Sequence, residues 1–257
     1  MKICVLIKQV PSADSPLRLN DAGSWIQEEN VTFTTNESDA YALEEALQIK
    51  EREGEGEVVV ASLGPDRVQR AIREALSKGA DRGIHIQEAF PYITDPLVSA
   101  TLFASVLRDE EFHLILSGLQ SDDLGMAQTG VILGQLLGMS TATLAVAVEL
   151  QGSSVRVKRE LESGWFQWVT MDLPASVTVQ SGINTPRYPS LKGIMGAKKK
   201  EIRAVAKQDL VENDRPLQKF TRIYVPRKTK RTEMIEGEPG EVVVKLVDVL
   251  KRNVKVL

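Results

Sequence analysis

Short apolar runs, each followed along the chain by a helical pattern, constrain the fold of these 257 residues more than any other feature. The runs lie at residues 3–7, 58–63, 84–86 and 114–116, and the second and third are interrupted by Ser62 and His85. The helical patterns lie at about 38–52, 67–78, 95–107 and 125–137. Continuous apolar runs are typical of parallel strands covered on both faces. Their alternation with helices predicts an α/β fold, in which helices cover both faces of a parallel sheet.

The pattern changes after residue 144, where short strands follow one another without helices. We expect them at 144–150, 154–160, 166–172 and 175–180, as a short antiparallel extension of the same domain. Trp165 and Trp168 would lie on opposite faces, so at least one should cover the core or a partner. A further short strand is expected at 202–205.

The chain divides by pattern into two parts. Residues 1–205 form the α/β domain, and residues 206–257 form a polar, proline-containing arm that ends in an amphipathic helix at about 241–254. An arm of this kind suits a subunit that clasps another chain.

Composition excludes several classes of protein. A net charge of −3 argues against a nucleic-acid binder. The basic clusters at 198–200 and 227–231 are either solvated surface or a docking surface for an acidic partner. Cys4 is the only cysteine, and His85 and His113 lie far apart, so we expect neither a disulfide nor a metal site. No stretch has the ~20 apolar residues of a membrane span, and no signal peptide is evident, so we expect an intracellular chain.

A polar turn after the fourth apolar run is the strongest candidate for a ligand site. In open parallel sheets, ligands bind beyond the carboxyl ends of the strands, so the loops after residues 7, 63 and 116 should converge with the start of the 38–52 helix. Gly118 and Gly125 would let the backbone approach a ligand. A strand, a tight turn and a helix start present N–H groups to a phosphate. The alternative is an ordinary strand–helix connection, capped by one of the residues 121–123.

The segment 182–195 contains two prolines and two glycines, so we expect no continuous secondary structure there. It nevertheless carries several apolar side chains, namely Ile183, Tyr188, Leu191, Ile194 and Met195. Such a loop either folds back onto the core or offers these side chains to a partner.

Several segments together resemble the small (beta) subunit of electron transfer flavoproteins. They include Val5-Leu-Ile-Lys-Gln-Val-Pro11, Tyr41-Ala-Leu-Glu-Glu-Ala46, Ser62-Leu-Gly-Pro65, Gly79-Ala-Asp-Arg-Gly-Ile-His85, the turn from Gln120 to Gly130, and Pro186-Arg-Tyr-Pro-Ser-Leu-Lys-Gly-Ile-Met195 before Ala197-Lys-Lys-Lys200. The matching segments are collinear from residue 1 to about 205.

The resemblance implies a parallel-sheet adenine-nucleotide-binding domain that is Rossmann-like, of the nucleotide alpha-hydrolase type. It also implies a heterodimer with an alpha subunit that holds most of the FAD. The beta subunit would bind AMP, or a second FAD in electron-bifurcating members that use NADH. Residues 121–126 differ from the form found in many bifurcating members, which favours AMP. The complex would carry electrons from an acyl-CoA dehydrogenase-type flavoenzyme to a quinone oxidoreductase or another acceptor, in the cytoplasm or, in a eukaryote, in the mitochondrial matrix. We expect no catalytic residue in this chain.

Carried over by position, the nucleotide pocket falls on loops that the sheet argument also brings together. Its residues are Leu6, Asn36, Glu37, Ser38, Asp39, Leu63, Gly118, Leu119, Gln120, Ser121, Asp122, Asp123, Leu124, Gly125, Met126, Ala127, Gln128 and Thr129. The phosphate would lie on the N–H groups near 126–129, although two carboxylates beside it would repel it unless they faced ribose or solvent.

The family's recognition loop, which docks on the partner dehydrogenase, falls on residues 179–201. Leu191 would be its anchor, and Tyr188, Ile194, Met195 and Lys199 would also face the partner. Lys199 matches a lysine that is methylated in some members, but its neighbour in that pattern is Gly196 here. An adenine-nucleotide-hydrolysing enzyme of related fold is a distant alternative, and residues 8–12 lack the phosphate loop that it needs.

Overall fold

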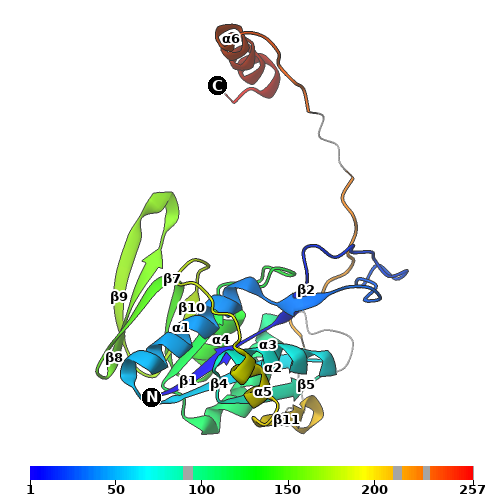
Figure 1. Cartoon of the computed structure of the whole chain (residues 1–257). Coiled ribbons are helices and arrows are strands. Elements are labelled where there is room, and N and C mark those ends of the chain that lie inside the picture. The colour runs from blue at the N-terminus through cyan, green and yellow to red at the C-terminus, as the bar shows by residue number, and fades with distance from the viewer. Residues whose placement is uncertain (89–94, 211–215, 228–231, 257) are drawn as a thin grey trace. The chain divides into compact units, whose positions relative to one another are not determined.

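The computed structural model describes residues 1–88, 95–210, 216–227 and 232–256 (Figure 1). It falls into two compact units, residues 1–222 and 223–257, which we describe separately. Most of the basic cluster expected at 227–231 lies outside the described residues.

The first unit is built on a sheet that has nine strands within the described residues. The strands are β11 (Ile202–Ala206), β5 (Arg82–Gln87), β4 (Glu57–Gly64), β1 (Lys2–Leu6), β6 (Leu114–Gly118), β10 (Ala175–Val179), β7 (Ser140–Gln151), β8 (Ser154–Glu160) and β9 (Phe166–Asp172), in spatial order. Pairing is parallel from β11 to β7, and antiparallel from β7 through β8 to β9. The predicted parallel sheet, its antiparallel extension and the strand at 202–205 are confirmed.

One strand lies in a different place from the one we expected. The run at 175–180 was assigned to the antiparallel extension, but β10 pairs in parallel with both β6 and β7. All five of its residues are buried, as expected of a central strand covered on both faces. A small antiparallel ribbon, β2 (Gln9–Pro11) with β3 (Phe33–Thr35), stands beside the main sheet.

Helices cover both faces of the sheet, as predicted. The helices are α1 (Glu37–Glu53), α2 (Gln69–Lys78), α3 (Pro96–Leu107), α4 (Thr129–Leu136), α5 (Leu191–Ala197) and, in the second unit, α6 (Pro239–Val249) followed by a π-helical turn, Leu250–Val254. Short 3₁₀ turns occur at Asp66–Val68, Arg108–Glu110, Glu162–Gly164 and Lys207–Asp209. The amphipathic helix predicted at 241–254 is therefore confirmed.

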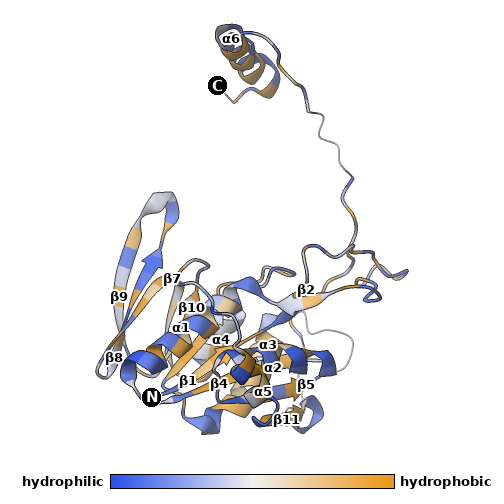
Figure 2. Ribbon diagram, in the orientation of Figure 1, coloured by the Kyte–Doolittle hydropathy of each residue, from blue (hydrophilic) through white to orange (hydrophobic). Residues whose placement is uncertain are grey.

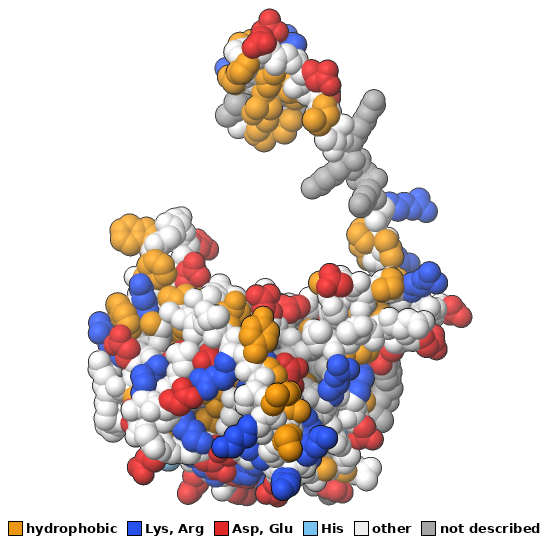
Figure 3. All heavy atoms as spheres, viewed as in Figure 1, with side chains coloured by type: hydrophobic (Ala, Val, Ile, Leu, Met, Phe, Trp, Pro, Cys, Tyr) orange, Lys and Arg blue, Asp and Glu red, His pale blue; other side chains and the backbone are white. Residues whose placement is uncertain are grey.

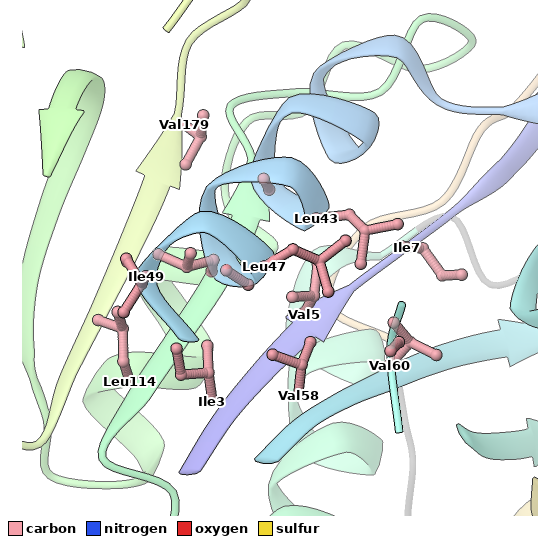
Figure 4. Close-up of a cluster of buried hydrophobic side chains, with 14 of the residues drawn as sticks. Ile3, Val5, Ile7, Leu43, Leu47, Ile49, Val58, Val60, Leu114 and Val179 are labelled. Carbon is pink, nitrogen blue, oxygen red and sulfur yellow. The ribbon is translucent and has the colours of Figure 1, made fainter. Parts of the chain in front are cut away.

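Two apolar clusters separated by the sheet form the core. Ile3 and Val5 of β1 face the helices α1 and α2, whereas Cys4 and Leu6 face α3 and α4. Figure 4 shows Leu43 and Leu47 of α1 directed onto β1. Figure 2 shows the central strands as mainly hydrophobic. Cys4 is fully buried, as predicted, and this burial raises the pKa of its thiol.

Two helix predictions need correction. The helix expected from residue 125 begins only at Thr129, because Gly125 and Ala127 adopt positive φ angles of 61° and 53° that a right-handed helix does not allow. The segment 182–195, for which we expected no continuous secondary structure, is partly helical, because α5 begins at Leu191. The Ser190 hydroxyl caps this short helix by accepting a hydrogen bond from Gly193 N at 3.0 Å.

Neither tryptophan of the antiparallel extension covers the core. Trp165 is 73% exposed and Trp168 is 39% exposed, although Trp168 lies 4.1 Å below the Arg156 guanidinium. Of the two alternatives, cover of the core is therefore excluded, and contact with a partner stays a prediction. Within the described part of the chain, no helix is long and apolar enough to cross a membrane, and no acidic, histidine or cysteine side chains cluster as metal ligands do.

Candidate functional site

A cleft opens at the carboxyl ends of β1, β4 and β6, where parallel-sheet proteins place their ligands. Its volume is about 170 Å³. One water molecule needs only ~15 Å³ of such space, so the cleft can admit an organic ligand. The predicted residues that line it are Leu6, Asn36, Asp39, Leu63, Gly118, Leu119, Gln120, Ser121, Asp123, Leu124, Met126, Ala127, Gln128 and Thr129.

The other four predicted residues support the lining loops without lining the cleft themselves. The Ser38 hydroxyl donates to Gln120 O at 2.8 Å, and Glu37 N donates to Asp122 Oδ2 at 3.1 Å. Gly125 N donates to Ser121 O at 2.8 Å, which closes the turn on itself. The sequence therefore identified loops that do meet in space, although not every member faces the cleft.

Asn36 links the start of α1 to the turn after β6. Its backbone occupies the N-cap position, yet its side chain makes no capping bond. Instead its Nδ2 donates to Gln120 O at 2.9 Å, and its Oδ1 accepts from Asp122 N at 2.8 Å. The amide thus satisfies backbone groups of a segment more than eighty residues away and fixes the wall of the cleft.

Asp39 joins two strand ends beneath this wall. Its Oδ2 accepts from Lys8 N at 2.7 Å, and its Oδ1 accepts from Gly118 N at 2.9 Å. Burial raises the pKa of Asp39 to about 7, against the opposing effect of these N–H groups, the Asn36 side chain and the Lys8 charge. Gly118 is required here, because a Cβ would collide with Ser38 Oγ and Asp39 Oδ1.

Both carboxylates of the turn are paired. Lys8 Nζ lies 2.6 Å from Asp123 Oδ1 and also donates to Ser121 Oγ at 3.2 Å. Asp122 accepts from the first N–H of α1, where the helix dipole favours a negative charge. The Lys8 charge therefore offsets the repulsion expected between Asp123 and a phosphate, while Asp122 does not line the cleft.

Unpaired donors distinguish the next part of the turn. The backbone N–H groups of residues 126–131 have no acceptor among the residues that the structure describes. The Ser117 hydroxyl, which lines the cleft and is buried, also lacks a hydrogen-bond partner there. These groups stand at the amino end of α4, where N–H groups and the helix dipole attract anions.

Sequence reasoning missed part of the lining. Lys8 and Gln9 directly follow β1, so the rule that places ligands at strand ends could have found them. The same rule could have found Arg67, which lies in the turn after β4, but not Phe33, which belongs to the β2–β3 ribbon. The Arg67 guanidinium stacks 3.6 Å from the Phe33 ring centroid and donates to Gln9 Oε1 at 2.6 Å. They add a cationic and aromatic wall to the cleft.

The residues predicted to meet a partner lie on a different surface, around α5. Tyr188, Leu191 and Met195 are 94%, 84% and 72% exposed, and Ile194 and Lys199 are exposed as well. Ile183 alone of the apolar side chains in this segment packs against the core. Figure 3 shows hydrophobic side chains around α5 with lysine and arginine side chains beside them. Of the two alternatives for this loop, Ile183 folds back onto the core, and the other apolar side chains stay exposed, as a partner surface would require.

Comparison with known proteins agrees with the resemblance drawn from the residues. The profile of the electron transfer flavoprotein domain matches residues 24–210. The electron transfer flavoprotein subunit beta of Methylophilus methylotrophus is 35% identical over 97% of this chain and 98% of its own. The proteins of that name from Bradyrhizobium diazoefficiens and Bacillus subtilis are 37% and 32% identical, each over the full length of both chains. The chain belongs to the beta-subunit family of electron transfer flavoproteins, which are electron-carrier subunits.

Proposed function

We propose that this chain is a Rossmann-like adenine-nucleotide-binding subunit that holds AMP in the cleft and forms a heterodimer with an alpha subunit. The observation that carries the proposal is the row of unpaired N–H groups at residues 126–131 beside the unpartnered Ser117 hydroxyl. The Ser117 hydroxyl is buried, and the N–H groups stand at the amino end of α4, where free donors and the helix dipole favour a bound anion. The phosphate of AMP provides several acceptor oxygens.

The sequence of the site favours AMP over a second FAD. Residues 121–126 depart from the form that many bifurcating members have. An electron-bifurcating subunit that uses NADH remains the second candidate, because Arg67 and Phe33 offer a stacking surface at the cleft.

The second unit supports contact with the alpha subunit. Val243, Val244 and Leu246 of α6 are 58%, 69% and 44% exposed. Apolar side chains of this kind, left uncovered on one helix, suit burial against another chain. We propose that the arm, residues 206–257, clasps the alpha subunit. A chain ending at Arg222 should keep its AMP but fail to co-purify with the alpha subunit. If the truncated chain co-purified with the alpha subunit in the same yield as the full-length chain, this role of the arm would be contradicted.

The shared FAD, held mainly by the alpha subunit, would supply the redox chemistry, while this chain would position the complex on its partners. The electron donor would be an acyl-CoA dehydrogenase-type flavoenzyme, and the acceptor a quinone oxidoreductase or a similar protein. In this proposal Leu191 is the docking anchor, since one buried central side chain can carry much of an interface's free energy.

Co-expression with an alpha subunit tests the proposal. We expect a yellow heterodimer whose FAD is reduced when an acyl-CoA dehydrogenase and its acyl-CoA are added. Leu191→Ala should raise the apparent KM for the heterodimer by roughly tenfold or more, with kcat unchanged, because it removes docking contacts only. Colourless chains that never associate, or a heterodimer that none of a panel of acyl-CoA dehydrogenases reduces, would contradict the proposal.

A further inference from the structure

Arg187, which directly precedes the exposed apolar segment 188–195, is tied to two carboxylates of α1. Its Nε and one terminal nitrogen donate to the two oxygens of Glu44 at 2.8 and 2.9 Å. Its terminal nitrogens also donate to Glu51 at 2.5 and 3.1 Å, and its backbone N–H donates to Glu44 at 3.2 Å. We call these contacts of Arg187 with Glu44 and Glu51 the Arg187 clamp.

The clamp is strong by the usual criteria for ion pairs. The Glu44 side chain is only 5% exposed, and it also accepts from Gln48 at 2.8 Å. Burial alone would raise the pKa of Glu44, but the hydrogen bonds from Arg187 and Gln48 hold it below its usual value. Only the planar fork of arginine can bridge two carboxylates in this way, and a lysine cannot.

A second attachment holds the other end of the segment to α2. A terminal nitrogen of Arg73 donates to Ala197 O and Lys200 O, both at 2.6 Å. The Lys200 ammonium donates to Leu76 O and Ala80 O near the end of α2. Between the two attachments, Gly193 lies so close to Ser77 O that a Cβ would not fit. The backbone of the segment is therefore fixed on both sides while its apolar side chains stay exposed.

Such a segment has little conformational freedom left to lose when it docks. Ordering a loop at an interface costs free energy that reduces affinity, and a loop already held in shape avoids most of that cost. The exposed side chains Tyr188 and Leu191 follow Arg187 closely in the chain. Loss of the Arg187 clamp would therefore change the positions of these two side chains more than those of residues farther along the segment.

We propose that Arg187 is a positioning residue, whose clamp on Glu44 and Glu51 presets the segment 188–195 for docking and so sets the affinity for the partner flavoenzyme. This inference rests on the proposed docking role of Leu191. It differs from a stabilising ion pair in one respect: the effect of losing Arg187 must depend on the presence of the Leu191 side chain.

Hydrogen exchange on the heterodimer tests whether the Arg187 clamp holds the segment 188–195 in shape. In Arg187→Gln, amides of residues 188–196 should exchange roughly tenfold or more faster than in the wild type, while those of α1 and the sheet keep their protection. The control is Arg70→Gln, which removes the same charge from an exposed α2 side chain that has no ion pair within the described residues. Unchanged exchange at 188–196 in Arg187→Gln would overturn the inference.

Steady-state kinetics test whether the clamp sets the affinity for the partner. They use an acyl-CoA dehydrogenase that reduces the wild-type heterodimer. Arg187→Gln should raise the apparent KM for the heterodimer roughly five- to twentyfold without changing kcat, and should add less than about twofold in a Leu191→Ala background. An equal rise of the apparent KM in both backgrounds, or no rise, would overturn this inference but not the docking role proposed for Leu191. If Leu191→Ala itself leaves KM unchanged, the docking role proposed above fails, and the inference fails with it.

Discussion

The Ser117 hydroxyl is the residue-scale feature that most directly separates a ligand site from ordinary packing. It lines the cleft, is buried and has no partner within the described residues. If it donates to bound AMP, Ser117→Ala should weaken AMP binding roughly five- to tenfold, the loss of about one hydrogen bond. Isothermal titration of nucleotide-stripped protein measures this.

Ser62 provides the matched control for that measurement. Its hydroxyl is equally buried and equally without a partner in the described part of the chain, but it does not line the cleft. Ser62→Ala should leave AMP affinity unchanged. Equal effects of the two substitutions would show that Ser117 acts through packing and not through the ligand.

Asp39 makes stability depend on pH. Its pKa is raised by burial to about 7, whereas its ordinary value is 3.8, so the folded state binds the proton more tightly than the unfolded state. The contribution is therefore fully present at low pH and is lost as pH rises through about 7. Between pH 5 and pH 8 the free energy of unfolding should fall by about 2.5 kcal/mol from this group.

Chemical denaturation of the wild type and of Asp39→Asn at these two pH values checks this prediction. Asparagine does not titrate, so the difference between the two proteins should itself change by that amount. The fixed cost of the substitution cancels in the comparison, even though an amide cannot accept from both Lys8 N and Gly118 N as the carboxylate does. A difference that is the same at both pH values would mean that Asp39 is ionised throughout.

At the scale of elements, the position of α4 depends on the absence of a side chain at Gly130. A Cβ there would collide with Ser117 Oγ and lie 2.9 Å from Thr178 Cγ2. Gly130→Ala should destabilise the protein by about 1–3 kcal/mol through overpacking, and should weaken AMP binding by displacing the N–H groups at the start of α4. Thermal unfolding and AMP titration measure the two effects.

Gly196 of α5 is the control for that substitution. It has an ordinary helical conformation and open space where a Cβ would stand. Gly196→Ala should therefore leave the melting temperature unchanged or slightly raised, since alanine favours helix. The account of α4 would be wrong if both alanine variants melted at the same temperature.

Elements whose sequence pattern is local were predicted well. The strands β8 and β9 were predicted at their observed bounds, because Val155 and Val157 alternate with charged residues and a glycine-containing turn precedes them. The start of α4 and the partner strands of β10 were not predicted correctly. The start of α4 depends on positive φ angles at Gly125 and Ala127. The partners of β10 depend on which strands lie next to it in space.

The same distinction holds for the candidate site. The meeting of loops from β1, β4 and β6 follows from a general rule about parallel sheets, so the sequence could predict it. The pairing of Asp123 with Lys8, and of Asp122 with the start of α1, joins segments about a hundred residues apart. No local pattern contains that information, which is why the sequence predicted repulsion where the structure has one ion pair and one hydrogen bond from a helix start.

Across the whole first unit, the amino ends and the carboxyl ends of the parallel strands differ in the side chains that they gather. At the amino ends of the strands, Glu110 binds Lys2, Arg82 and Arg203, with contacts of 2.8, 2.6 and 3.2 Å. These contacts join β1, β5 and β11. The carboxyl ends instead surround the cleft and its unpaired N–H groups. The amino ends of these strands are therefore joined by charge pairs, and the carboxyl ends are left to form the candidate ligand cleft.

The central claim is that the cleft of this subunit holds AMP, and the nucleotide content of the purified heterodimer tests it most directly. The protein is denatured, the released nucleotides are separated by chromatography, and AMP and FAD are counted against protein. The account predicts one AMP and one FAD for each heterodimer. Two FAD without AMP, or one FAD with no other adenine nucleotide, would contradict it.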